Sequence, residues 1–216
     1  MTIVNAIRDR LKKFGVTAAI IFGSFIGQKE HRDIDVLIVL AEPGDTRVMR
    51  AALCEINVNI DPTFVTTETF EENLLIGNPF YINVLKGETV IGIRYVERCK
   101  EMAGTPSGEI TRRYFDMALH AYRRAKWSKE YFDCYVTCKF LIEHLMMKNG
   151  MYVTNPHHYK AYLAELNLPL DREAVRAVSR ILMHRRGDAE LYEDDVNRVT
   201  RILGSVWFEH DPNQQH

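Results

Sequence analysis

The sequence lacks any apolar run approaching the roughly 20 residues that a membrane-spanning helix needs. Its first residues, "MTIVNAIRDRLKKFG", have the spacing of an amphipathic helix instead of the apolar centre of a signal peptide. Cysteine is scarce and forms no zinc-type Cys-x-x-Cys pair, which indicates reduced thiols at Cys54, Cys99, Cys134 and Cys138. We therefore expect a cytoplasmic protein with no membrane partner.

An excess of either charge is also missing. Lysine and arginine number 28 against 29 aspartates and glutamates, and the formal net charge is −1. The charge of each half of the chain is close to neutral as well, which argues against a strongly basic nucleic-acid-binding domain. The chain does have 46% hydrophobic residues over 216 positions, enough for one large folded domain or two small ones.

Glycine and proline gather between two halves with different patterns. The stretch "AGTPSGE" interrupts the helix and strand patterns on either side of it. We therefore predict a first domain over residues 1–103, a linker over 104–108, a helical domain over 109–210 and a disordered tail over 211–216.

The two halves together predict an α+β fold. In the first half, short strands are dispersed among helices, which favours a small mixed sheet covered by helices. Its expected strands are 17–22, 34–40, 56–66 and 88–93, and its expected helices are 3–14, 44–55, 67–76 and 78–86. The second half has apolar residues at helical spacing throughout, which predicts an all-α up-down bundle with helices over 109–127, 131–150, 157–166, 171–185 and 193–209.

Two carboxylates lie one residue apart at the start of "DIDVLIV". Because side chains alternate along a strand, Asp33 and Asp35 point to the same side, with their Cα atoms about 7 Å apart. Such a pair can share Mg²⁺, which takes few carboxylates together with waters and substrate phosphates. Upstream, Gly23 lets the backbone approach a phosphate closely, and Ser24 adds a hydroxyl and an amide. The stretch therefore predicts a nucleoside triphosphate site.

The order Gly-Ser, loop, Asp-x-Asp on a strand resembles the nucleotidyltransferase superfamily that includes DNA polymerase beta, over about residues 1–100. The resemblance implies two Mg²⁺ ions that bridge the acids and the triphosphate. It also implies attack of an acceptor hydroxyl on the α-phosphorus, with pyrophosphate leaving. In the loop, Lys29 and Arg32 are predicted triphosphate contacts, and a solvated loop is the alternative. Arg32 stands where this family commonly has serine, and the loop is shorter than usual.

The family pattern places a third acid on an adjacent strand, where it binds metal and accepts the proton of the acceptor. In "INVNIDP" the predicted polar face of the strand includes Asn59 and Asp61. Asp61 is the only carboxylate on that face, but Asn59 fits the family spacing at least as well, and an asparagine would be a weak ligand and a poor base. The predicted catalytic and metal-binding residues are Asp33, Asp35 and Asp61, with Asn59 as the alternative metal ligand to Asp61.

The second half resembles the HEPN family of helical bundles, on the stretch "RYFDMALHAYRRAKWSKEYFDCYVTCKFLIEHLMMKNG". RNA-cleaving members of that family carry arginine, four to six residues, then histidine, often followed by a tyrosine. Here Arg185 is followed by Glu190 at the histidine position and then by Tyr192. Glutamate cannot replace the imidazole of histidine in acid–base catalysis, so ribonuclease activity is the least expected function. In paired systems a tyrosine at this place can be adenylylated, and the alternative for Tyr192 is a helix-packing residue.

The leading prediction is an Mg²⁺-dependent enzyme that transfers a nucleoside monophosphate, AMP from ATP, to a hydroxyl of a protein, an RNA or a small molecule. The alternative is a regulatory module whose degenerate site binds nucleotide without transfer. A homo-oligomer formed through the helical domain is compatible with both.

Overall fold

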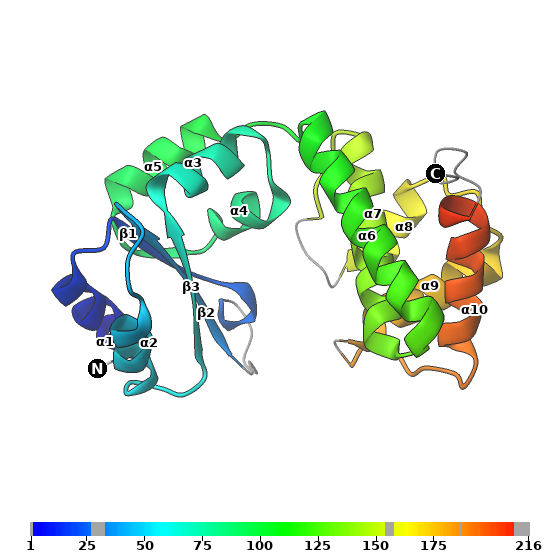
Figure 1. The fold of residues 1–216 in the computed structure, drawn as a ribbon, viewed down its shortest axis with the longest axis horizontal. Coiled ribbons are helices and arrows are strands. Elements are labelled where there is room, and N and C mark those ends of the chain that lie inside the picture. The colour runs from blue at the N-terminus through cyan, green and yellow to red at the C-terminus, as the bar shows by residue number, and fades with distance from the viewer. Residues whose placement is uncertain (1, 27–32, 154–157, 186, 210–216) are drawn as a thin grey trace. The chain divides into compact units, whose positions relative to one another are not determined.

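The computed structural model describes residues 2–26, 33–153, 158–185 and 187–209. It divides into two compact units, Met1–Ser107 and Gly108–His216 (Figure 1). The first contains a four-stranded mixed sheet with helices, and the described part of the second contains only helices. The predicted α+β fold class is therefore confirmed. The predicted tail over 211–216 lies outside the described residues.

The sheet of the first unit has the strand order β3-β2-β1-β4. Its strands are β1 (Ala18–Phe22), β2 (Ile34–Leu40), β3 (Ile60–Thr66) and β4 (Glu88–Ile91). The helices of this unit are α1 (Ile3–Leu11), α2 (Arg47–Cys54), α3 (Thr67–Leu75), α4 (Pro79–Val84) and α5 (Ile93–Met102). β1 is antiparallel to β2 and to β4, whereas β2 and β3 are parallel, so the sheet is mixed as predicted.

Both faces of the sheet are covered by helices (Figure 1). Along β2, Val36 and Ile38 pack with α1 and α2, while Leu37 and Val39 pack with α3, α4 and α5. All four side chains are fully buried. This explains why β2 is a nearly continuous apolar run instead of an alternating one. Asp35 shares the face of Leu37 and Val39, because residues two apart point to the same side.

Two predictions for the first unit were wrong. The strand expected over 56–66 begins only at Ile60, because a turn intervenes in which the side chain of Asn57 accepts a hydrogen bond from the Asn59 N–H at 2.8 Å. The strand expected over 88–93 ends at Ile91, and a helix that we did not predict, α5, follows it. Most of α5 is charged or polar, and its helical pattern is carried by few buried residues.

The segment predicted as a linker is attached to the first unit. The N–H of Gly104 donates to the carbonyl of Leu74 at 2.9 Å, and the N–H of Ser107 donates to the carbonyl of Ile76 at 3.0 Å. Both carbonyls lie at or just after the end of α3. Residues up to Ser107 are thus bonded to the first unit, and α6 begins at the next residue.

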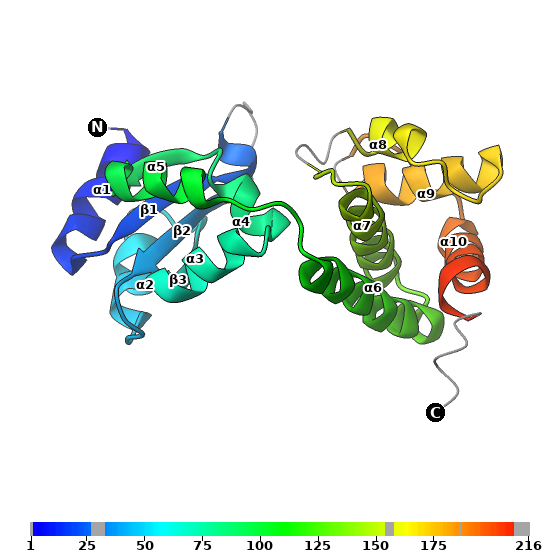
Figure 2. The same ribbon diagram turned by 90° about the horizontal axis from the view of Figure 1, so that it is seen from above.

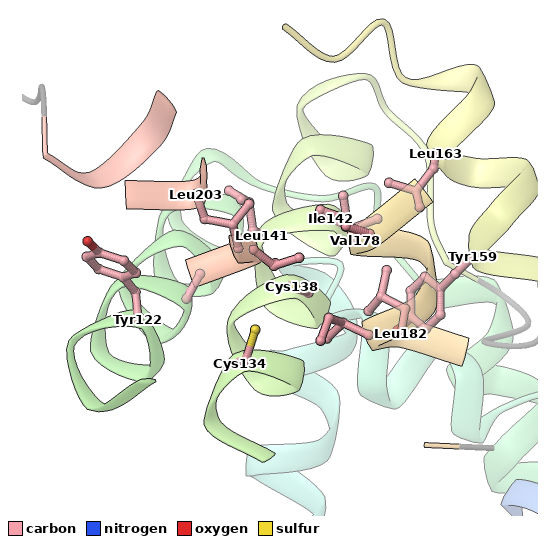
Figure 3. Packing of buried hydrophobic residues seen from close by; sticks show 14 of the residues in the cluster. Tyr122, Cys134, Cys138, Leu141, Ile142, Tyr159, Leu163, Val178, Leu182 and Leu203 are labelled. Atoms are coloured by element: carbon pink, nitrogen blue, oxygen red, sulfur yellow. The ribbon is translucent and has the colours of Figure 1, made fainter. Parts of the chain in front are cut away.

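The second unit consists of helices around a single buried cluster (Figure 3). The long helices α6 and α7 lie side by side in both Figure 1 and Figure 2 and are joined by a short turn. Cys134 and Cys138 are free thiols on α7 with no exposed surface, which fits packing residues. The helices are α6 (Gly108–Ser128), α7 (Tyr131–Lys148), α8 (Tyr159–Glu165), α9 (Arg172–His184) and α10 (Asp195–Leu203), followed by a π-helical turn, Gly204–Phe208. None of the helices in the described parts of either unit is long and apolar enough to cross a membrane.

Candidate functional site

Three strand ends meet at one end of the sheet. β1 ends at Phe22, while β2 and β3 begin at Ile34 and Ile60. In the register of these strands, Phe22 pairs with Asp35, and Asp35 pairs with Asp61. Paired residues point to the same face of a sheet, and neighbouring strands are about 4.8 Å apart. Phe22, Asp35 and Asp61 therefore form one row across three strands, which we call the acid row.

Asp35 lies at the centre of the acid row, and the pKa of its carboxyl group is raised. Burial raises the pKa of Asp35 from 3.8 to about 6, and the negative charges of Asp33 and Asp61 contribute to the same shift. The cause is that each of these charges, like the loss of solvent, disfavours the ionised form. Three acidic side chains, those of Asp33, Asp35 and Asp61, thus lie near one another at this end of the sheet. Carboxylate oxygens are ligands that a hard divalent cation prefers.

Gly23 connects the predicted phosphate turn directly to Asp35. It begins the 3₁₀ turn Gly23–Phe25, and its φ of 77° lies in the left-handed region that favours glycine. The Cβ of an alanine at position 23 would lie 2.1 Å from Oδ2 of Asp35. Because an added Cβ would overlap the carboxylate where it now lies, the backbone of the turn is directly against it. The two parts of the sequence signature are therefore neighbours in space.

Asp61, and not Asn59, lies in the acid row. Asn59 precedes β3, and its carbonyl accepts a hydrogen bond from the N–H of Ile34 at 2.9 Å, so it helps to start β2. A signal for Asp61 was present in the sequence, because "IDVLIVL" and "IDPTFVT" both begin with Ile-Asp and pair in that register. The alternation that we assumed over 56–59 obscured this signal, because those residues form a turn.

An arginine that we did not predict contacts Asp61. Nη1 of Arg50, on α2, lies 3.8 Å from Oδ1 of Asp61, and its Nη2 donates to the carbonyl of Pro62 at 2.8 Å. The guanidinium also lies 5.5 Å from the centre of the Phe64 ring. Both partners of the ion pair are more than half exposed, so the pair itself is weak. Nothing in the local sequence around Arg50 indicates this contact, which depends on the crossover from β2 to β3.

Of the other predicted site residues, Ser24 and Asp33 belong to the described part of the chain and two do not. The backbone of Ser24 lies in the turn after Gly23, and Asp33 is exposed immediately before β2. Lys29 and Arg32 lie outside the described residues. Within the described ranges, no three histidine, cysteine or acidic side chains are arranged to hold one metal ion. Gly23, Asp33 and Asp61 nevertheless all lie close to Asp35, and Ser24 follows Gly23 in the chain.

Substituting Asp35 with asparagine is expected to stabilise the first unit in the absence of divalent cations. The penalty for ionising Asp35 in the fold is absent well below pH 3.8, grows as the pH rises, and is complete above about pH 6. After allowance for partial solvent screening, we expect Asp35→Asn to add about 1–2 kcal/mol at pH 8 and much less at pH 4. Urea unfolding in EDTA at both pH values measures this.

The matched control for that prediction is Asp9→Asn on α1. Asp9 has an exposed side chain outside the acid row, so its variant should unfold like the wild type at both pH values. Equal effects of the two variants at pH 8, or an Asp35→Asn gain that does not shrink at pH 4, would contradict the electrostatic explanation.

In the helical unit, Tyr192 is held at the surface. It precedes α10, is 66% exposed, and its ring centre lies 4.4 Å from the guanidinium carbon of Arg180. The helix-packing alternative for Tyr192 was therefore wrong. Arg180 in turn makes two hydrogen bonds of 2.6 and 2.8 Å to the buried Asp195, an ion pair that we did not predict. Glu190 is exposed, and Arg185 follows the end of α9.

Comparison with known proteins gives no further assignment. The chain matches no model of a known protein family and no curated protein. A function therefore has to be inferred from the acid row and its surroundings.

Proposed function

We propose that the protein is an Mg²⁺-dependent nucleotidyltransferase that moves a nucleoside monophosphate, AMP from ATP, to an acceptor hydroxyl. One observation carries the proposal: Asp35 pairs in register with Asp61 while the backbone of Gly23 lies against its carboxylate. This is the combination that the resemblance to the polymerase beta superfamily implies for residues far apart in the sequence. A solvated Asp-x-Asp and an unrelated turn would have no reason to meet in this way.

Each residue of the site has a distinct role in the proposal. Asp33, Asp35 and Asp61 would hold Mg²⁺, which when bound neutralises charge on the triphosphate and the leaving pyrophosphate. The turn that begins at Gly23 and includes Ser24 offers backbone N–H groups to phosphate oxygens. Asp61 has an exposed carboxylate that can take the proton of the attacking hydroxyl. In the loop, Lys29 and Arg32 would contact the triphosphate.

The test is release of pyrophosphate. Wild-type protein is incubated with labelled ATP, Mg²⁺ and mixtures of protein, RNA and small-molecule acceptors, and label on each acceptor is measured as well. The control is a variant that carries both Asp33→Ala and Asp35→Ala. If the wild type releases no more pyrophosphate than this control in any mixture, the proposal is wrong.

The two candidates for the third acid give opposite expectations. Because a proton acceptor in such a reaction contributes about 100-fold or more, Asp61→Asn should lower the rate of transfer by at least that factor. Asn59→Ala should keep the rate within about threefold, because Asn59 contributes its backbone and lies outside the acid row. Initial rates at saturating ATP measure both. A larger loss for Asn59→Ala than for Asp61→Asn would reverse the assignment.

The alternative proposal is a regulatory module that binds nucleotide without transfer. It is favoured by the contact of Asp61 with Arg50, which gives the third acid a partner other than a reacting hydroxyl. Calorimetry with ATP and Mg²⁺ separates the two proposals, because tight binding without any pyrophosphate release supports the module. Ribonuclease activity stays the least favoured function, because Glu190 replaces the expected histidine.

The proposal also covers the acceptor of the nucleotide, the cellular compartment and self-association. The acceptor hydroxyl belongs to a protein, an RNA or a small molecule, and the exposed Tyr192 is one hydroxyl to examine by mass spectrometry after incubation with ATP. We place the protein in the cytoplasm, where ATP and Mg²⁺ are available. Self-association would involve the helical unit.

A further inference from the structure

An exposed aromatic ring lies beside the acid row. The ring of Phe80, on α4, contacts the ring of Phe22 with their centres 5.6 Å apart and their planes at 85°. Phe22 is the member of the acid row that pairs with Asp35. Phe80 is still 39% exposed. Part of Phe80 is therefore open to solvent, and Phe80 lies over the same face of the sheet as Asp35 and Asp61.

The position of this ring is fixed by its neighbours. The ring of Tyr81 meets Phe80 with centres 5.0 Å apart and planes at 86°, and Tyr81 itself contacts the buried Phe70 at 5.6 Å. Asn78 caps the start of α4 by accepting a hydrogen bond from the Phe80 N–H at 3.1 Å. The backbone hydrogen bond and the rings of Phe22 and Tyr81 thus restrict the position of Phe80. Little conformational entropy is therefore lost when a ligand stacks on its ring.

We infer that Phe80 is the stacking platform for the base of a purine nucleoside triphosphate whose phosphates lie at the acid row. The acids and the Gly23 turn offer groups for phosphates and a cation but no flat apolar surface, and Phe80 supplies one beside them. Stacking on a ring is tolerant of base identity, so ATP and GTP should bind with similar affinity and the larger purines better than pyrimidines. Phe80 has this role only if the acid row binds a nucleotide, so the inference rests on the proposed function.

The test compares a nucleotide with the triphosphate alone. Calorimetry with Mg²⁺ and either a non-hydrolysable ATP analogue or inorganic tripolyphosphate is done on the wild type, Phe80→Leu and Phe80→Trp. Leucine keeps apolar packing against Phe22 but removes the ring. We expect Phe80→Leu to weaken binding of the ATP analogue by about tenfold or more and to change tripolyphosphate binding by less than about twofold. Phe80→Trp should bind the analogue at least as well as the wild type.

The matched control is Val48→Ala, an exposed apolar residue on α2, which packs on the other face of the sheet. This variant should bind both ligands like the wild type. Phe80→Trp also supplies a spectroscopic readout, because the two natural tryptophans, Trp127 and Trp207, both lie in the helical unit. The added fluorescence of Phe80→Trp should be quenched by the ATP analogue and left unchanged by tripolyphosphate.

The outcomes separate this inference from the proposed function. Equal losses of both ligands in Phe80→Leu, or a tryptophan signal that does not respond to the analogue, would overturn the role of Phe80 while leaving nucleotide binding in place. If the wild type binds neither ligand, the proposed function and the inference are both wrong.

Discussion

Replacing Asp195 by alanine is expected to lower the free energy of unfolding of the helical unit by about 3 kcal/mol. Asp195 is only 3% exposed and pairs with Arg180 through two hydrogen bonds, while it also accepts one from the N–H of Tyr192 at 2.9 Å. Removal of the carboxylate leaves the Arg180 guanidinium, whose side chain is 22% exposed, largely desolvated and without its partner. The backbone turn before α10 loses an acceptor at the same time.

Tryptophan fluorescence during urea unfolding measures this effect. Trp207 packs against the core of the helical unit, and neither tryptophan lies in the first unit, so the signal reports the unit that contains Asp195. The control is Glu173→Ala, which removes an exposed ion pair with Arg198 and should cost less than about 0.5 kcal/mol. Equal costs for Asp195→Ala and Glu173→Ala would show that the buried pair does not stabilise the unit.

The same pair predicts how the helical unit responds to acid. The hydrogen bonds from Arg180 hold the pKa of Asp195 below its ordinary value of 3.8. A group whose pKa is lowered in the fold stabilises it above its unfolded pKa and loses that effect as the pH falls below this value. The difference in stability between wild type and Asp195→Ala should therefore shrink below about pH 4.

Substituting Gly23 with alanine is expected to lower the proposed transfer rate by about 100-fold or more, because a displacement of a reacting group by about 1 Å has this effect. The new Cβ would overlap Oδ2 of Asp35, and the carboxylate, as the end of a side chain, can rotate away. The cost in stability should be only about 1–2 kcal/mol, from the left-handed backbone at position 23. The main damage is therefore to the placement of Asp35.

Gly15 supplies a control for backbone strain. It has a φ of 64°, close to that of Gly23, but a Cβ at position 15 would meet no atom within 4 Å. Gly15→Ala should lose a similar amount of stability in thermal unfolding and keep its transfer rate within about twofold when corrected for the folded fraction. A similar loss of rate in both variants would mean that strain, and not contact with Asp35, causes the effect at Gly23.

The sequence predicted β1 and β2 well because both are short apolar runs with clear ends. It failed over 56–59, where alternating polar and apolar residues have the period of a strand. The Asn57 side chain accepts a hydrogen bond from the Asn59 N–H there and closes a turn. It also missed α5, because charged residues are numerous in this helix and its few apolar residues do not form a clear helical pattern. Local patterns could not distinguish these cases, because the backbone there is determined by individual hydrogen bonds and by packing on the sheet.

Some residues of the candidate site could likewise be predicted from the local sequence, and others could not. Gly23, Asp33 and Asp35 were identified from one continuous stretch, and the structure brings them together. The choice between Asp61 and Asn59 required the pairing of β2 with β3, which is a contact between distant parts of the chain. The contacts of Arg50 with Asp61 and of Phe80 with Phe22 are likewise set by helices that cross the sheet. No periodicity in the sequence encodes them.

The parallel pairing of β2 and β3 also determines which insertions and deletions the acid row can survive. Asp61 is the second residue of β3, on the face of Asp35, and its neighbours Ile60 and Pro62 point to the opposite face. A one-residue slip of β3 would turn the Asp61 carboxylate toward α1 and α2, although every residue type in the strand would be unchanged. A two-residue slip would restore its face but move it along β2. The place of Asp61 in the acid row thus depends on whether an odd or an even number of residues is added or removed between the turn and β3.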